Sequence, residues 1–227
     1  MRFEELFDRN APLIMEQRHQ RETPPVEGGR WPVSAVIMID GALGARLDLL
    51  TAELAELAGP GHFHTGRAGS AHLTIRALER FRAVVPDGDP AVARYASALH
   101  RAGARTDPFA VSLSGLSVTP LAVVARVEVG AREVTELSAR FADDLGPDDW
   151  LEREHVSRTF RHVTLLHFGA DLARPSALLD WVADRRALAL GSTTVTAVDL
   201  VRARHRLLPD GQFMELSPLI PPVRLGS

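Results

Sequence analysis

The chain has 227 residues, of which 45% are hydrophobic, so it is long enough to bury a sizeable core. Its net charge of −3 argues against a protein that binds long nucleic acid through the phosphates, because surfaces that bind phosphates in this way are usually strongly basic. The absence of cysteine excludes disulfide frameworks and thiolate zinc sites.

The N-terminal part predicts a helical arm and a linker. Residues 2–20 carry Phe3 and Leu6 on one apolar stripe, and the Pro- and Gly-rich stretch 23–29 is typical of a linker. We expect residues 1–30 to pack outside the domain or on a partner subunit, giving a monomer or a dimer through the arm. The N-terminus is not a secretory signal, and no stretch approaches the roughly 20 apolar residues of a transmembrane helix, which predicts a cytoplasmic protein without membrane contact.

The next elements alternate strand and helix. An apolar strand is predicted over residues 33–39, followed by a helix with leucines at three- and four-residue spacing over 43–57. A polar-apolar strand covers 70–76. A second helix begins at Pro90, since proline is favoured in the first helical turn, and a strand follows over 109–118.

The second half repeats this order. A strand is predicted over 121–129, a helix over 134–145, a strand over 160–166, a helix beginning at Pro175, and a strand over 193–202. Duplicated halves usually pack about a pseudo-twofold axis. The sequence therefore predicts a single bilobal α+β domain, in which two mainly antiparallel sheets face a central cleft.

The third element of each half carries the same polar pair. His72 and Thr74 lie two residues apart in the first strand, and His162 and Thr164 repeat the pair 90 positions later. On a strand, residues two apart share a face, so each half presents an imidazole beside a hydroxyl. We expect the two pairs to face one another across the cleft.

These strings resemble the 2H phosphoesterase superfamily, and most closely its bacterial 2'-5' RNA ligase and cyclic phosphodiesterase branch. The segments that carry the resemblance are His72-Leu73-Thr74-Ile75-Arg76-Ala77-Leu78 and Phe160-Arg161-His162-Val163-Thr164-Leu165. The strand, turn and strand of residues 198–219 are similar to the C-terminal hairpin of that branch. Arg161 stands where the branch often has proline, and residues 1–30 have no counterpart in it. The bilobal domain would then span residues 31–220, with a tail at 221–227.

The resemblance implies a metal-independent phosphodiesterase without a cofactor. Its substrate would be a 2',3'-cyclic nucleotide, a cyclic phosphate at an RNA end, or a 2'-5' phosphodiester. Two imidazoles facing one substrate can supply a base that activates water and an acid that protonates the leaving ribose oxygen. Thr74 and Thr164 would donate hydrogen bonds to the non-bridging oxygens. Which histidine is the base depends on the direction in which the substrate lies.

Other side chains are candidates for binding the substrate. Arg76 shares the strand face of His72 and is predicted to contact phosphate, with a plain surface salt bridge as the alternative. Trp150 follows an acidic turn and is a candidate lid that stacks on a base. Arg202 and Arg204 alternate on a strand and form either a cationic wall or the charged face of an exposed hairpin.

Two histidines precede the first motif. No carboxylate lies at a familiar ligand spacing from His62 and His64, so we expect no metal site there. His64 is instead a candidate for contacting the edge of the substrate.

Two other functions remain open. The scaffold is also suited to another acid-base reaction on a small metabolite, or to binding nucleotides or RNA ends without turnover. The aromatic content of 6% counts against a platform that binds RNA by base stacking. The partner that we expect is a small phosphorylated substrate, a cyclic nucleotide or an RNA end, rather than long duplex nucleic acid.

Overall fold

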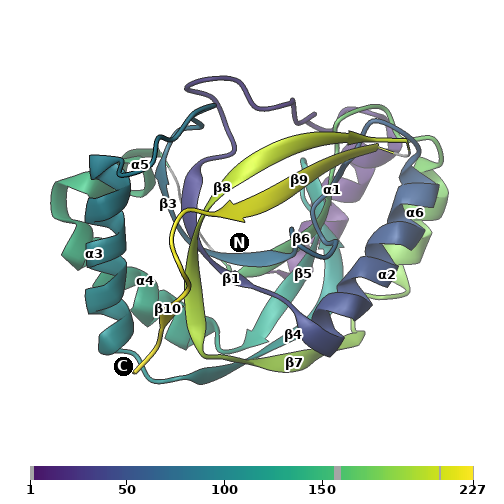
Figure 1. Cartoon of the computed structure of the whole chain (residues 1–227). Coiled ribbons are helices and arrows are strands. Elements are labelled where there is room, and N and C mark those ends of the chain that lie inside the picture. Colours follow the sequence, from purple (N-terminus) through teal and green to yellow (C-terminus); the bar gives the residue numbers. More distant parts are fainter. Residues whose placement is uncertain (1–2, 156–159, 210, 227) are drawn as a thin grey trace.

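The computed structural model describes residues 3–155, 160–209 and 211–226 as an arrangement of helices around a large sheet (Figure 1). The helices are α1 (Glu4–Met15), α2 (Gly41–Ala58), α3 (Pro90–Ala104), α4 (Ala131–Leu145), α5 (Trp150–His155) and α6 (Pro175–Ala183). The strands are β1 (Val33–Met38), β2 (Phe63–His64), β3 (His72–Glu79), β4 (Phe109–Val118), β5 (Ala122–Val129), β6 (His162–His167), β7 (Ala189–Val195), β8 (Ala197–Leu208), β9 (Gly211–Pro218) and β10 (Val223–Arg224).

The helix boundaries follow from local sequence. Pro90 and Pro175 occupy the first turns of α3 and α6, as predicted. The Asp89 side chain caps α3 by accepting hydrogen bonds from the backbone N–H groups of Ala91 and Val92, at 2.9 and 3.1 Å. α2 ends at Ala58 and is followed by the capping residue Gly59, whose φ of +86° disfavours any side chain.

In the described part of the chain, ten strands form one hydrogen-bonded sheet. Its order is β2-β9-β8-β1-β3-β6-β5-β4-β7, and β10 pairs with β8. β2 also pairs with β6, so the six strands β2, β9, β8, β1, β3 and β6 close into a ring. The barrel-like ring gives the sheet a concave inner surface.

The last strand of each predicted half lies in the other half of the sheet. β4, predicted to end the first half, pairs with β5 and β7. The predicted strand 193–202 is two strands, of which β7 pairs with β4 and β8 pairs with β1. The reason is local: β4 and β5 are joined by a short turn, and adjacent antiparallel strands pair most readily as a hairpin.

Two lobes can nevertheless be distinguished. The first lobe contains β1, β3, β8 and β9, and the second contains β4, β5, β6 and β7. They meet where β3 pairs with β6, through the single register pair Leu73 and Val163. The predicted α+β class is confirmed, and the two facing sheets are two parts of one continuous sheet.

Helices cover both lobes around a shared core. α3 and α4 pack together beside the first lobe, and α2 and α6 pack beside the second (Figure 1). Buried side chains from both lobes belong to one contiguous hydrophobic cluster, which includes Leu47, Leu73, Phe141 and Phe168. Burial of this apolar surface is the main term that holds the lobes together.

The N-terminal arm packs on its own chain. α1 lies against β4 and α6, and its buried Phe3 and Leu6 contact Ala122 and Val124 of β5. The apolar stripe predicted from the sequence is therefore covered by the second lobe.

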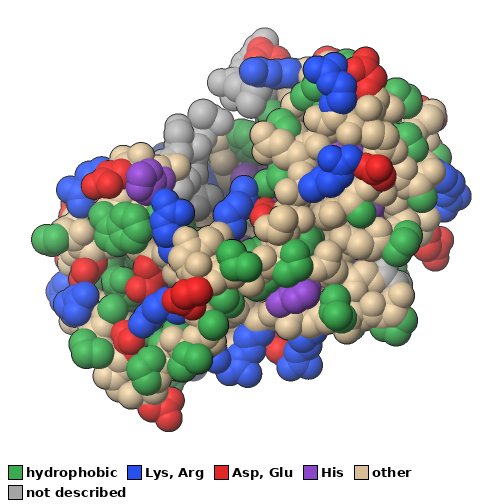
Figure 2. Space-filling model, turned by 90° about the horizontal axis from the view of Figure 1, so that it is seen from above, with side chains coloured by type: hydrophobic (Ala, Val, Ile, Leu, Met, Phe, Trp, Pro, Cys, Tyr) green, Lys and Arg blue, Asp and Glu red, His purple; other side chains and the backbone are tan. Residues whose placement is uncertain are grey.

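The surface is mixed in charge. Figure 2 shows basic and acidic side chains interspersed over the face of the molecule seen from above. None of the helices in the described ranges has both the length and the apolar character needed to cross a bilayer.

Candidate active site

The two histidine-threonine pairs lie on neighbouring strands. β3 and β6 are antiparallel, and Leu73 is paired with Val163. One step along this register in each direction places His72 opposite Thr164, and Thr74 opposite His162. Diagonal neighbours on paired strands lie about 7–8 Å apart, with their Cβ atoms somewhat closer, so the two histidines lie within reach of one small group bound between them.

All four side chains line one cavity of about 580 Å³. Its walls come from five strands of the closed ring, the end of β2, α5 and the segment before β1. The lining residues are Gly29, Arg30, Trp31, Pro32, Ser34, Val36, Thr65, Ser70, His72, Thr74, Ala77, Arg80, Leu151, His155, His162, Thr164, His167, Val201, Ala203, Met214 and Leu216. The cavity is large enough for a nucleotide-sized ligand.

The His72 ring has a defined tautomer. Its Nδ1 lies 2.7 Å from the carbonyl oxygen of Ser70, which can only accept a hydrogen bond. Nδ1 therefore carries the proton, and in the neutral ring the lone pair is on Nε2. The His162 ring packs against Phe160, with centroids 5.0 Å apart.

A bulge follows each threonine and changes which residue faces the cavity. The register of β3 against β1 shifts so that Ala35 pairs with Arg76 but Val36 pairs with Thr74. β6 shifts against β5 at the matching position, after Thr164. A bulge inserts one residue and re-aims the side chains beyond it. Three residues after each threonine, Ala77 and His167 therefore line the cavity.

The predicted phosphate contact of Arg76 is not supported by its position. The first bulge turns this side chain away from the cavity, onto Asp149 and Ser138. The guanidinium binds both oxygens of Asp149 and donates to Ser138 Oγ at 3.0 Å. Arg76 therefore forms a salt bridge, which was the alternative to the predicted phosphate contact, and this salt bridge is largely buried.

His167 is a site residue that the sequence reasoning missed. Its Nδ1 lies 3.2 Å from Thr65 Oγ1, and its ring meets that of Trp31 edge to face at 5.1 Å. Burial, with a smaller effect of Arg30, lowers its pKa to about 3, so the ring is neutral near pH 7. The bulge in β6 brings His167 to the cavity, and the alternation of polar and apolar residues in the sequence does not indicate this bulge.

His64 does not line the cavity, contrary to its predicted role. It lies in β2, paired with Leu166 and Phe213, and only 1% of its surface is exposed. A Cβ atom at Gly211 would lie 2.6 Å from His64 Nε2, so closure of the ring requires glycine there. His64 is therefore part of the wall behind the cavity.

His62 is also buried, and it makes folding sensitive to acid. Burial lowers its pKa to about 4 from the usual 6.5. Its ring contacts the Ala58 carbonyl and accepts from the Gly169 N–H, at 3.2 and 3.3 Å. Between pH 4 and pH 6.5 the unfolded chain therefore binds more protons than the folded chain. The free energy of unfolding has its full value above pH 6.5 and decreases as the pH falls toward 4.

We therefore expect His62→Gln to flatten this pH dependence, because glutamine keeps an amide donor and acceptor but does not titrate. The slope is expected to fall by up to about 1.4 kcal/mol per pH unit, the equivalent of one proton. Urea unfolding at a series of pH values measures it. His100→Gln, on the exposed face of α3, is the control. An unchanged slope in His62→Gln contradicts the assignment.

Trp150 does not cover the cavity. It begins α5, and its ring packs edge to face on His155 at 6.0 Å. Leu151 and His155, one helical turn apart, supply the cavity-lining face of α5 instead.

Arg202 and Arg204 lie on the outer face of β8. Val201 and Ala203 line the cavity, and strand alternation turns the arginines to the other side. Arg202 donates to the Ala83 carbonyl at 3.2 Å, and Arg204 is exposed. The predicted alternation is confirmed, but the cationic wall does not face the cavity.

Arg161 bridges the two motif strands. Its Nη1 donates to the carbonyl oxygens of Thr74 and Ile75, both at 3.3 Å. These carbonyls belong to the first bulge. Arg161 therefore holds the bulge against β6 from the face opposite the cavity.

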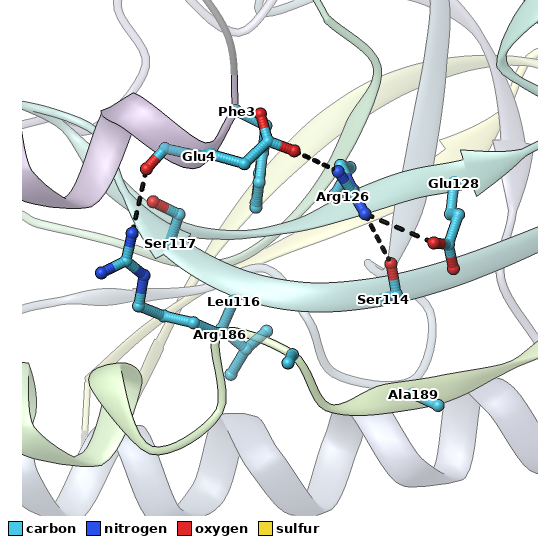
Figure 3. A pocket seen from close by; sticks show the side chains of 10 residues that line it. Phe3, Glu4, Ser114, Leu116, Ser117, Arg126, Glu128, Arg186 and Ala189 are labelled. Atoms are coloured by element: carbon cyan, nitrogen blue, oxygen red, sulfur yellow. Dashed lines mark hydrogen bonds and ion pairs between the residues drawn. The ribbon is translucent and has the colours of Figure 1, made fainter.

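A smaller hollow of about 270 Å³ lies beside the arm. Figure 3 shows Arg126, the cross-strand neighbour of His162, directed at Glu4, Ser114 and Glu128. Because this guanidinium is engaged by two carboxylates, it contributes little positive potential to the neighbouring histidine.

No group of three or more potential metal-ligating His, Asp or Glu side chains is found among the residues that the structure describes.

Comparisons with known proteins identify both the sequence family and the fold. A sequence profile described as the 2'-5' RNA ligase superfamily matches residues 69–206. TT0787 of Thermus thermophilus is 18% identical, with a TM-score of 0.59 over 86% of this chain and 98% of that one. E. coli LigT complexed with 3'-AMP is 14% identical, with a TM-score of 0.62 over 87% and 99%. No curated protein matches in sequence.

Proposed function

Because the chain belongs to the 2'-5' RNA ligase superfamily of 2H phosphoesterases, we propose that it is a metal-independent phosphodiesterase that uses His72 and His162 as acid and base. The substrate is a 2',3'-cyclic nucleotide, a cyclic phosphate at an RNA end, or a 2'-5' phosphodiester. The observation that carries the proposal is that both histidine-threonine pairs line the same cavity.

The reaction is a displacement at phosphorus by water. The neutral imidazole takes a proton from water while the water oxygen bonds to phosphorus. The protonated imidazole gives a proton to the ribose oxygen as its bond to phosphorus breaks. Since His72 Nδ1 donates to Ser70, its Nε2 is the nitrogen that exchanges the proton. The hydroxyls of Thr74 and Thr164 donate to the non-bridging oxygens, where negative charge increases in the transition state.

The charge of the site favours a small substrate. Arg30 and Arg80 supply the cationic character of the cavity, while Arg76, Arg202 and Arg204 are directed elsewhere. The interspersed charges of Figure 2 offer no broad basic face for a duplex on the side seen there. A nucleotide or the end of an RNA strand therefore fits the cavity better than long nucleic acid.

Hydrolysis of the four nucleoside 2',3'-cyclic phosphates and of a 2'-5' dinucleotide tests the proposal. We expect turnover of at least one, with a bell-shaped dependence on pH because one imidazole must be neutral and the other protonated. A chelator is expected to leave the rate unchanged. Tight binding of cyclic nucleotides without turnover would favour a binding protein. Turnover that survives the loss of both Thr74 and Thr164 hydroxyls would favour another acid-base reaction.

A further inference from the structure

The segment between α1 and β1 forms a strap, residues 16–32, that joins the lobes. Gln20 donates to the Pro120 carbonyl at 2.8 Å, and Glu22 to that of Phe168 at 2.6 Å, both on the second lobe. Gly28 and Gly29 exchange backbone hydrogen bonds with Phe81 of the first lobe, at 2.9 and 3.1 Å. Figure 1 shows this dark segment passing over the top of the sheet. The strap lies outside residues 69–206, which the family profile matches.

Trp31 lies in the strap with an unusual backbone conformation. Its φ is +69°, in the left-handed region that bulky residues rarely adopt. Such a conformation is strained and persists only where the surrounding structure holds it. Here the indole N–H donates to the Thr23 carbonyl at 3.0 Å, and the ring lies 5.3 Å from Phe63 and 5.1 Å from His167. The strained conformation directs an aromatic ring to the cavity wall.

Arg30 places a cation next to this ring. Arg30 also lines the cavity, and its Nε lies 3.1 Å from Glu22 Oε2. The Glu22 side chain is 3% exposed and the Arg30 side chain 65%, so a buried carboxylate anchors an accessible guanidinium. Two adjacent residues of the strap thus offer a stacking surface and a positive charge.

We propose that the strap completes the substrate site, with Trp31 stacking on the nucleobase of the substrate and Arg30 facing its phosphate. This inference rests on the proposed function and assigns the binding of the substrate's nucleobase to the strap. His167 holds the edge of the Trp31 ring, and the neutral imidazole adds no charge that would compete for the phosphate.

The size and lining of the cavity support a base beside the phosphate. At about 580 Å³ it is much larger than a phosphate group needs. Its inner wall of Ala203, Met214 and Leu216 is apolar and continuous with Trp31 and Phe63. Such an apolar wall favours contact with a planar, weakly hydrated ring, and the nucleobase is the part of the substrate with that character.

Paired kinetics with and without a base test the inference. The variants are Trp31→Leu and Trp31→Phe, and the substrates are adenosine 2',3'-cyclic phosphate and the base-free glycerol 1,2-cyclic phosphate. Stacking is worth about 1–3 kcal/mol per base, so Trp31→Leu should lower kcat/KM for the nucleotide by about 5- to 150-fold, chiefly through KM. Trp31→Phe should retain most activity. The base-free substrate should be unaffected by either change.

Trp181→Leu is the matched control, because this tryptophan packs under Arg185 on α6, with its indole N–H on Glu53. Both substrates should be unaffected by it. An equal loss on both substrates in Trp31→Leu, or no loss on either, overturns the inference.

A second measurement separates this inference from the proposed function. If the wild type hydrolyses neither substrate, the proposed function fails, and calorimetric binding of 3'-AMP and of inorganic phosphate replaces kinetics. Weaker binding of 3'-AMP alone in Trp31→Leu supports base stacking. Unchanged 3'-AMP binding overturns it.

Discussion

We expect replacement of His72 or His162 by alanine to lower kcat/KM for a 2',3'-cyclic nucleotide by about 10²- to 10⁴-fold, because each change removes one of the two proposed proton transfers. The loss lies mainly in kcat, since the proton moves only in the transition state. Steady-state kinetics at the pH optimum measure it, and urea unfolding shows that each variant is folded.

The control for these changes is His100→Ala, an exposed histidine on α3 that is remote from the cavity lining. It should retain wild-type activity. The double variant of His72 and His162 should lose less than the product of the two single losses, because the two groups act in one step. Near wild-type activity in either single variant on every phosphodiester tested would remove the assignment of the site.

Replacing Arg76 by methionine destabilises the protein by about 3–5 kcal/mol, the cost of leaving a buried charge without its partner. The side chains of Arg76 and Asp149 are only 14% and 10% exposed. The guanidinium also donates to Ser138 Oγ of α4, so the change loosens that helix from β3. Urea unfolding measures the loss.

Two further variants make this prediction specific. Arg94→Met breaks a pair with Asp148 whose side chains are 57% and 27% exposed, and should cost at most about 1 kcal/mol. The double variant Arg76→Met with Asp149→Leu should recover part of the stability, because no charge is left buried. If Arg76→Met instead raised KM several-fold at unchanged stability, the predicted phosphate contact would be right and the structural role wrong.

The position of Arg76 shows the limit of strand alternation. Its position two residues after Thr74 predicts a shared face, and an unbroken strand would give that result. The bulge depends on how β3 pairs with β1, a strand more than 30 residues earlier in the chain. The same device in β6 brings His167 to the cavity, where alternation would place Leu166.

Local signals in the sequence were sufficient for most of the longer helices and strands and for the two histidine-threonine pairs. Apolar spacing and proline positions located the helices that begin at Pro90 and Pro175, and the spacing of two between histidine and threonine put each pair on one face. These features depend on residues close together in the chain, where backbone geometry alone dictates the outcome.

Tertiary structure decided which surfaces meet. The pairing of β8 with β1 and the closure of the strand ring at Gly211 both depend on contacts between residues distant in sequence. The strap is the clearest case: a stretch with the composition of a linker crosses both lobes and brings Trp31 to the cavity. The composition of such a segment indicates only that it is flexible in isolation. Its position in the folded protein is determined by backbone hydrogen bonds to Pro120, Phe168 and Phe81.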